Sequence, residues 1–159
     1  MRKGADKSMN SLTLLADLAR FGQSGLASEA ALDQALTRLA SSLYADLVMF
    51  YFTHRPDGPL SARHVGHRKG RLSHRGYLMT AGMALRSYEK TKTITSVKRD
   101  QYLIACVPMW HTSGEILGIL AFAFDTIVVE EPPHESLLLV ISALMARIAV
   151  QQPDLRGWS

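Results

Sequence analysis

Apolar residues recur at helical spacing in several parts of the chain. The first part begins at Ser11, a suitable N-cap, and the second follows Ser28, after the glycines of "FGQSGL". A shorter helix is expected in "YLMTAGMALRSYEK", ending near Lys90. A long apolar helix is expected from about Ser136 to Gln151, after the prolines and glutamates of "EEPPHES", which suit a first helical turn. The pattern therefore predicts four helices.

Runs rich in β-branched and aromatic residues predict five strands between these helices. The most regular are "DLVMFYFT" (46–53), "QYLIACVPMW" (101–110) and "ILGILAFAFD" (116–125), and the last two flank a hairpin turn, "HTSGE". "SARHVGH" and "TKTITSV" are weaker and more polar strands. Because the strands cluster and are mostly joined by hairpins, we expect an antiparallel sheet covered by helices, an α+β fold.

Three residues of the long hairpin have backbone roles that the sequence predicts. Gly118 lies in the middle of a strand, where the missing side chain lets another element come close. Pro108 cannot donate a hydrogen bond to a neighbouring strand, so it belongs at a strand end or a bulge. Gly114 suits a left-handed turn position.

The length of 159 residues fits one domain, which we place at residues 11–152, between a flexible start (1–10) and a tail (153–159). Cys106 is the single cysteine, so no intrachain disulfide can form, which fits a reducing compartment. No apolar run resembles a signal peptide or reaches the roughly 20 residues of a membrane helix. We therefore expect a cytoplasmic protein that does not enter the membrane.

Positive charge is concentrated in one segment. The formal net charge is +4, but Gly58–Tyr88 carries six Arg or Lys and no Asp or Glu, which leaves 12 basic and 14 acidic residues elsewhere. The centre of this segment is "RHVGHRKGRLSHR", residues 63–75. It can be a solvated loop, the rim of an anion-binding pocket, or a nucleic-acid patch. The last is disfavoured because exposed aromatic residues that would stack on bases are not interleaved with the basic ones.

The order of several segments resembles the GAF domain family. "QYLIACVPMWHTSGEILGILAF" resembles the last hairpin of that family, and "AALDQALTRLASSLYADLVMFYF" resembles its helix leading into the first strand. "GMALRSYEKTKTITSV" is similar to the lid helix and the strand after it, and "ESLLLVISALMARIAV" to the C-terminal helix. The resemblance covers about residues 12–151.

This resemblance implies a sheet of five to six strands with the N- and C-terminal helices on one face. On the other face, a loop and helix lid is expected to cover a pocket for a small molecule. Alternation along the strands turns Val48, Phe50 and Phe52 toward the helices, which leaves Met49 and Tyr51 for the pocket side. With the lid and the basic rim, the residues expected at the ligand site are Met49, Tyr51, Arg68, Arg71, His74, Arg75, Tyr77, Tyr88, Ile104, Cys106 and Trp110.

Several kinds of chemistry are not expected. Cys106 lies in an apolar strand and is expected to be buried and inert, and a lone cysteine cannot form the resolving disulfide of a free methionine sulfoxide reductase, an activity of one branch of GAF-like proteins. No cysteine lies in the lid, so bilin attachment is not expected. His64 and His67 have ligand-like spacing but no Cys or acidic ligand beside them, so haem and metal are not expected either.

The sequence thus predicts a sensor that binds a polar or anionic small molecule and is not an enzyme, acting on a separate output protein. A ligand-free GAF scaffold that dimerises or docks a partner is the alternative, and a reductase is the third, disfavoured one. The last helix carries more apolar residues than one face of a helix can bury. We therefore expect a homodimer through the terminal helices.

Overall fold

A five-stranded antiparallel sheet forms the middle layer of the protein, in the order β2-β1-β5-β4-β3. The structure is a computed structural model and describes residues 2–23, 29–56, 58–60, 62–67, 74–91, 93–152, 155 and 158. Its elements are α1 (Arg2–Gln23), α2 (Glu29–Leu43), β1 (Leu47–Phe52), β2 (Ala62–His67), α3 (His74–Arg86), the π-helical turn η1 (Ser87–Thr91), β3 (Thr95–Arg99), β4 (Tyr102–Trp110), β5 (Ile116–Asp125) and α4 (Glu135–Ala149).

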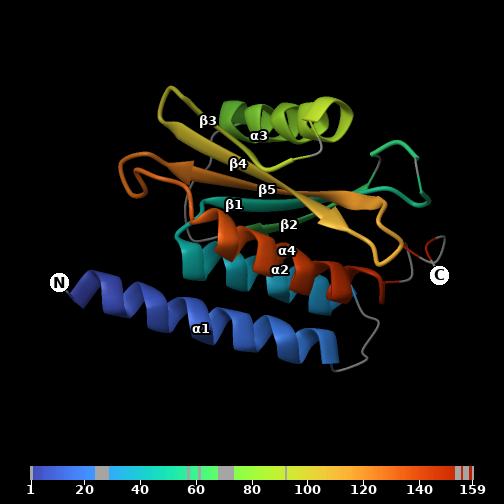
Figure 1. The fold of residues 1–159 in the computed structure, drawn as a ribbon. Helices are drawn as coiled ribbons and strands as arrows, with labels where there is room; N and C mark the ends of the chain where they lie inside the picture. The colour runs from blue at the N-terminus through green and yellow to red at the C-terminus, as the bar shows by residue number, and fades with distance from the viewer. Residues whose placement is uncertain are drawn as a thin grey trace.

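The helices cover the two faces of the sheet unequally. Helices α1, α2 and α4 lie below the sheet in Figure 1, and α3 alone lies above it. The expected α+β fold, with the terminal helices on one face and a helix on the other, is therefore confirmed.

The main core lies between the sheet and α1, α2 and α4. Val48, Phe50 and Phe52 of β1 point into it, as alternation along the strand predicts. Phe122 and Phe124 of β5 lie in the same core. Together with Phe21, which is partly buried against it, all five phenylalanines of the chain are on this side of the sheet.

Two glycines allow backbones to touch. A Cβ on Gly118 would lie 2.1 Å from the carbonyl oxygen of Tyr51, so the close approach expected at this position is confirmed. A Cβ on Gly66 of β2 would lie 2.3 Å from the backbone carbon of Leu36, which the sequence analysis missed. Strand β2 therefore packs directly against the backbone of α2.

The hairpin between β4 and β5 has the expected geometry. Gly114 has φ 89°, the left-handed conformation expected for the turn. Pro108 lies one residue before Met109, after which the register between β4 and β5 shifts. It also lies beyond Cys106, the last residue of β4 that pairs with β3. In the described part of the chain, the pairing of β4 with β3 ends at Cys106, so the missing N–H of Pro108 interrupts none of the β3–β4 pairs.

The helix boundaries differ from the expected ones at both ends of the chain. Helix α1 begins at Arg2, so Ser11 lies inside it and is not an N-cap, and residues 2–10 are helical where a flexible start was expected. Helix α4 begins at Glu135, and its N-cap is His134, whose Nδ1 accepts a hydrogen bond from the backbone N–H of Ser136 at 3.1 Å.

Leu155 and Trp158 pack against the domain, although they were expected to belong to a tail. Leu155 is 1% exposed and Trp158 is 7% exposed, and both belong to the main core. The indole Nε1 of Trp158 donates a hydrogen bond to the carbonyl oxygen of Thr53 at 2.8 Å, and its ring lies 5.1 Å from that of His111. The tail thus connects the end of β1 with the turn after β4.

Among the described residues, no helix is both long enough and apolar enough to span a membrane.

Candidate functional site

A second apolar cluster lies between the sheet and α3, and we call it the α3 layer. It is separate from the main core because it uses the opposite faces of the same strands. Its buried members are Leu47, Met49, Ala84, Tyr102, Ile104, Cys106, Ile119, Ala121 and Ala123, and its partly buried members are Tyr51, Leu60, Val65, Tyr77, Met79, Met83, Tyr88 and Val97.

Beyond Ile119, the side chains that the central strand β5 directs to this face are small. Ala121 and Ala123 point toward α3, whereas Phe122 and Phe124 point into the main core. In the strand register, Ala121 lies between Met49 of β1 and Cys106 of β4. The small side chains of β5 therefore leave room for the larger side chains of its neighbours and of α3.

Six of the expected ligand-site residues belong to the α3 layer. They come from three parts of the fold that meet only in the tertiary structure: β1, β4, and the helical segment formed by α3 and η1. The six are Met49, Tyr51, Tyr77, Tyr88, Ile104 and Cys106.

Tyrosines give the α3 layer its polar groups. Four of the five tyrosines of the chain are members, in contrast to the phenylalanines of the main core. The hydroxyl of Tyr88 donates to the carbonyl oxygen of Gly58 at 2.6 Å, which ties η1 to the connection between β1 and β2. The hydroxyl of Tyr51 points to the sulfur of Met49 at 3.6 Å. A tyrosine combines an apolar ring with one polar tip, so the layer can contact both apolar and polar parts of a molecule.

Among the described residues of α3, η1 and the strands that face them, no buried side chain is charged, and Thr80 and Ser87 contribute buried hydroxyls. One hydroxyl there, Oγ1 of Thr95, is buried without a hydrogen-bond partner in the described part of the protein. Thr95 pairs with Cys106 across β3 and β4, so both side chains are on the α3 side of the sheet. An uncharged group that accepts a hydrogen bond fits this interior better than a carboxylate or an ammonium does.

Cys106 is fully buried in the α3 layer. Burial raises the pKa of its thiol to about 12, because the apolar surroundings disfavour the thiolate. The thiol is therefore protonated at neutral pH and is a poor nucleophile.

The basic rim is described only in part. Arg68 and Arg71 lie outside the described residues, and so does the side chain of His74. Arg75, at the start of α3, forms an ion pair with Asp100 in the turn between β3 and β4, at 2.8 Å. Arg75 therefore already has an anionic partner within the chain, and it links α3 to the sheet.

Trp110 does not join the α3 layer. It follows the register shift at the end of β4 and is 48% exposed. Trp110 was expected to close the pocket from the end of the hairpin, and in the structure that position lies outside the α3 layer.

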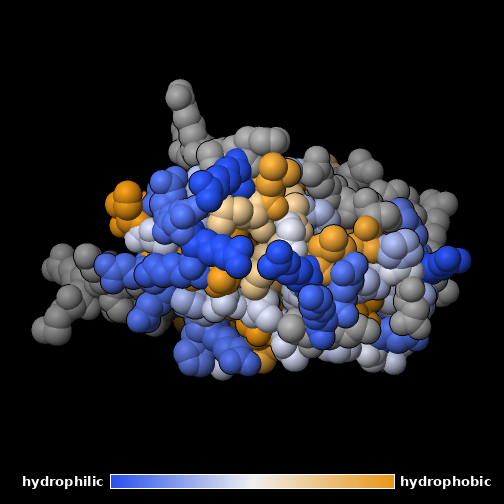
Figure 2. Space-filling view, turned by 90° about the horizontal axis from the view of Figure 1, so that it is seen from above, coloured by the Kyte–Doolittle hydropathy of each residue, from blue (hydrophilic) through white to orange (hydrophobic). Residues whose placement is uncertain are grey.

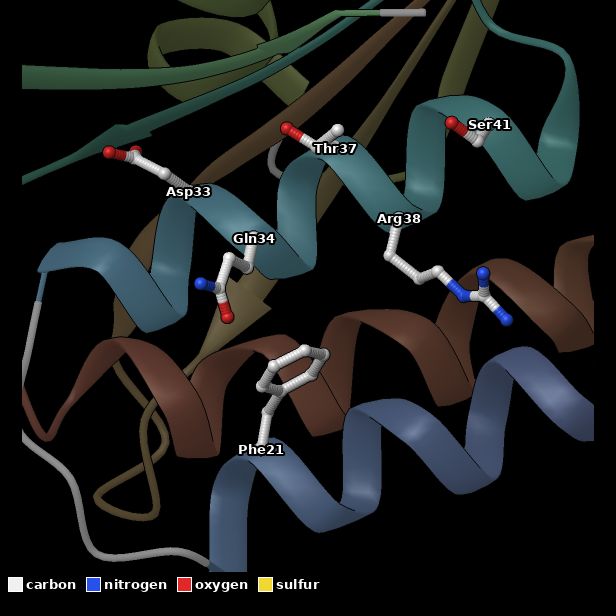
Figure 3. A pocket seen from close by; sticks show the side chains of 6 residues that line it. All are labelled: Phe21, Asp33, Gln34, Thr37, Arg38 and Ser41. Carbon is white, nitrogen blue, oxygen red and sulfur yellow. The ribbon is translucent and has the colours of Figure 1, made fainter.

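An open groove of about 520 Å³ lies on the other side of the sheet, between α1 and α2. Figure 3 shows Phe21 projecting from α1 toward polar side chains of α2. Arg38, at one end of the groove, is paired with Asp17 of α1 at 2.9 Å, and Asp17 also pairs with Arg20. The pKa of Asp17 is lowered, first by the hydrogen bond from Arg20. The residues that line the groove are Phe21, Asp33, Gln34, Thr37, Arg38 and Ser41.

This groove was not predicted from the sequence. The polar side of α2 has the sequence pattern of a solvated helix face. It forms one wall of a groove because Phe21 of α1 lies beside it in the tertiary structure. Among the described residues, no group of three His, Cys, Asp or Glu side chains could hold a metal ion.

Neither protein-family models nor curated protein sequences match this chain. Solved structures do match it over nearly its whole length. The GAF domain of a protein described as a sensor histidine kinase from Pseudomonas syringae pv. tomato has a TM-score of 0.61 at 17% identity, covering 91% of this chain and 88% of that one.

Two further GAF domains agree with this match. The one from A. aeolicus nlh2, in an inactive state, has a TM-score of 0.56 at 11% identity, with 90% of this chain and 97% of that chain covered. The one from an Acinetobacter phosphoenolpyruvate-protein phosphotransferase has a TM-score of 0.53 at 16% identity, with 87% and 92% covered. The order of elements, the five-stranded sheet and these matches together show that the protein has the fold of a GAF domain.

Proposed function

We propose that the protein is a cytoplasmic sensory module that binds a small molecule in the α3 layer and acts on a separate output protein. The observation that carries the proposal is the unequal composition of the two cores. The main core is built from phenylalanine and leucine, whereas the α3 layer gathers four tyrosines, three methionines and an unpartnered buried hydroxyl. Methionine side chains adapt to different shapes, and tyrosine hydroxyls can bond to a ligand.

The ligand class follows from the charges. Among the described residues, no buried side chain of α3, η1 or the strands is charged, so an apolar or aromatic part of the ligand would lie between the sheet and α3. A polar or anionic part would lie at the rim, near Arg68, Arg71, His74 and Arg75. In this proposal, the ligand anion meets the positive charges at the rim, where it can stay partly hydrated.

Thermal unfolding in the presence of small molecules tests the proposal. We expect a ligand at 100 times its Kd to stabilise the fold by about 2.7 kcal/mol, which raises the Tm by about 5–11 °C. Replacing Arg68, Lys69, Arg71 and Arg75 by Gln should remove the shift for an anionic ligand and leave the unliganded fold intact. The control is Arg147→Gln, on the exposed side of α4, which should leave the shift unchanged.

The outcomes separate the two leading functions. A shift that survives the fourfold substitution would contradict an anion at the rim. If a broad panel of amphipathic anions and aromatic molecules produces no shift, the protein is a ligand-free scaffold. A separate binding experiment tests a nucleic-acid role, which would appear as affinity for DNA or RNA that falls steeply as the salt concentration rises.

A signal needs a path to the output protein, and the terminal helices offer one. Helices α1 and α4 lie side by side, and a Cβ on Gly22 would be 3.7 Å from Cβ of Arg147. Their outer surface exposes apolar side chains, with Leu12 at 68%, Leu139 at 49% and Val140 at 45%. We propose that these two helices pair with those of a second copy across a two-fold axis and transmit ligand binding to the output protein.

A further inference from the structure

The outward face of α3 carries an apolar stripe with no role in the domain itself. Leu78 is 56% exposed and Leu85 is 46% exposed, and exposed Gly82 lies between them. At about 100° per residue, positions 75, 78, 82 and 85 of α3 fall within one face of the helix, less than 100° wide, and Glu89 follows about one turn after Leu85, in the π-helical turn η1. Figure 2 looks down on this side of the molecule and shows apolar surface bordered by hydrophilic side chains.

Gly82 is unusual because nothing in the protein requires a glycine there. A Cβ at this position would have no heavy atom within 4 Å, and the backbone has an ordinary helical conformation. A glycine inside a helix lowers stability by about 0.5–1 kcal/mol relative to alanine. A glycine on a helix surface allows a second helix to approach closely at that point.

The stripe is self-complementary about Gly82. Leu78 lies about 6 Å along the helix axis on one side, and Leu85 about 4.5 Å on the other. About 10 Å from Gly82, Arg75 ends the stripe in one direction and Glu89 ends it in the other, and both are exposed. Opposite charges at equal distances from a central glycine are the pattern that an antiparallel pair of identical helices requires.

We propose that α3 pairs with α3 of a second copy, antiparallel, with the two Gly82 residues at the crossing point. Leu78 of each copy then packs near Leu85 of the other, and Arg75 lies opposite Glu89 at both ends. The ion pair between Arg75 and Asp100 is compatible with this contact, since both side chains are exposed and a guanidinium can serve two carboxylates. Arg86 lies at the edge of the stripe, about 20° round the helix beyond Arg75, and its long side chain can extend past the contact into solvent.

The contact is distinct from the proposed pairing of the terminal helices, because α3 lies on the opposite side of the sheet from α1 and α4 (Figure 1). A stripe of four turns buries less than the roughly 1,200 Å² of a standard interface, so the association is weak by itself. Where the terminal helices also pair, the α3 contact joins one dimer to the next. The α3 contact also restrains α3 itself, the helix whose inner face covers the α3 layer.

Charge reversal and mixing test the proposal by sedimentation velocity. The experiment uses the full chain with Val140→Glu, which removes the proposed terminal-helix pairing. We expect this chain to change from monomer to dimer between about 10 µM and 1 mM. Adding either Arg75→Glu or Glu89→Arg creates two like-charge contacts in each pair and should weaken association at least about tenfold. An equimolar mixture of the two reversed chains restores both opposite-charge contacts, so association should return in the mixture.

Gly82→Glu provides a variant in which folding and association respond differently. The new side chain meets open space in the single chain and has the better helix propensity, so the Tm should stay equal or rise. Because the charge lies at the crossing point, association should disappear.

The proposal is overturned if the Val140→Glu chain stays monomeric up to about 1 mM. It is also overturned if the reversed chains do not recover association on mixing, or if Gly82→Glu associates as before. The ligand function is tested separately, by ligand-induced changes in the Tm of chains that keep Arg75.

Discussion

Single residues matter most in this protein where two backbones touch. Gly118 and Gly66 are on different strands, yet both remove a Cβ that would overlap another backbone, at Tyr51 and at Leu36. Backbone atoms cannot move aside as a flexible side chain can, so an added methyl group has to displace a whole element.

We expect Gly118→Ala and Gly66→Ala each to lower the free energy of unfolding by about 1–3 kcal/mol, or more if the strands cannot shift. Gly82→Ala is the matched control. Its Cβ meets open space, so it should raise the free energy of unfolding by about 0.5–1 kcal/mol. Urea unfolding at low protein concentration, followed by circular dichroism, measures all three. Equal effects of the three substitutions would contradict the close contacts.

Among the elements, the end of the chain contributes more than its composition indicates. Trp158 buries an indole in the main core and donates its hydrogen bond to Thr53, while Trp110 is half exposed at the end of β4. The two tryptophans therefore offer a matched comparison within one chain.

Trp158→Phe keeps an aromatic ring but leaves the carbonyl of Thr53 without this donor. We expect a loss of about 1–3 kcal/mol in the free energy of unfolding. Trp110→Phe should change it by less than about 0.5 kcal/mol, because the side chain is largely outside the core. Denaturant unfolding separates the two expectations. If both variants lose the same small amount, the packing of the chain end is not a stabilising part of the fold.

At the scale of the whole molecule, the outer face of α4 is the feature that most needs a partner. Leu139, Val140 and Val150 are exposed there, at 49%, 45% and 38%, next to α1 with its exposed Leu12. Protein interfaces bury exposed apolar side chains of this kind on adjoining helices.

We expect the wild-type chain to have at least the mass of a dimer by light scattering at tens of micromolar, and Val140→Glu to reduce that mass by half. Val140 is exposed in the single chain, so the variant should keep the Tm and the circular dichroism spectrum of the fold. The control is Thr37→Glu, on the exposed polar side of α2, which should leave the mass unchanged. A wild-type chain with the mass of a monomer would show that α1 and α4 cover each other within one subunit.

The sequence by itself determined which residues of β1 share a face and where the hairpin between β4 and β5 turns. Alternation in β1 places Val48, Phe50 and Phe52 on one side and Met49 and Tyr51 on the other, and this period depends only on the local backbone. The same local logic predicted Gly114 and Gly118. It says nothing of the surroundings of Trp110 at the end of the hairpin, because these depend on the register shift with the partner strand.

The tertiary structure alone decided which distant segments meet. The burial of Trp158 against Thr53, the contact of Gly66 with Leu36, and the ion pair between Arg75 and Asp100 each join residues that no local pattern connects. The separation of tyrosines and phenylalanines into two cores also appears only when β1, β4, β5 and α3 are assembled, since each strand contributes to both. Periodicity encodes the direction of a side chain, whereas its neighbours are set by the packing of the whole chain.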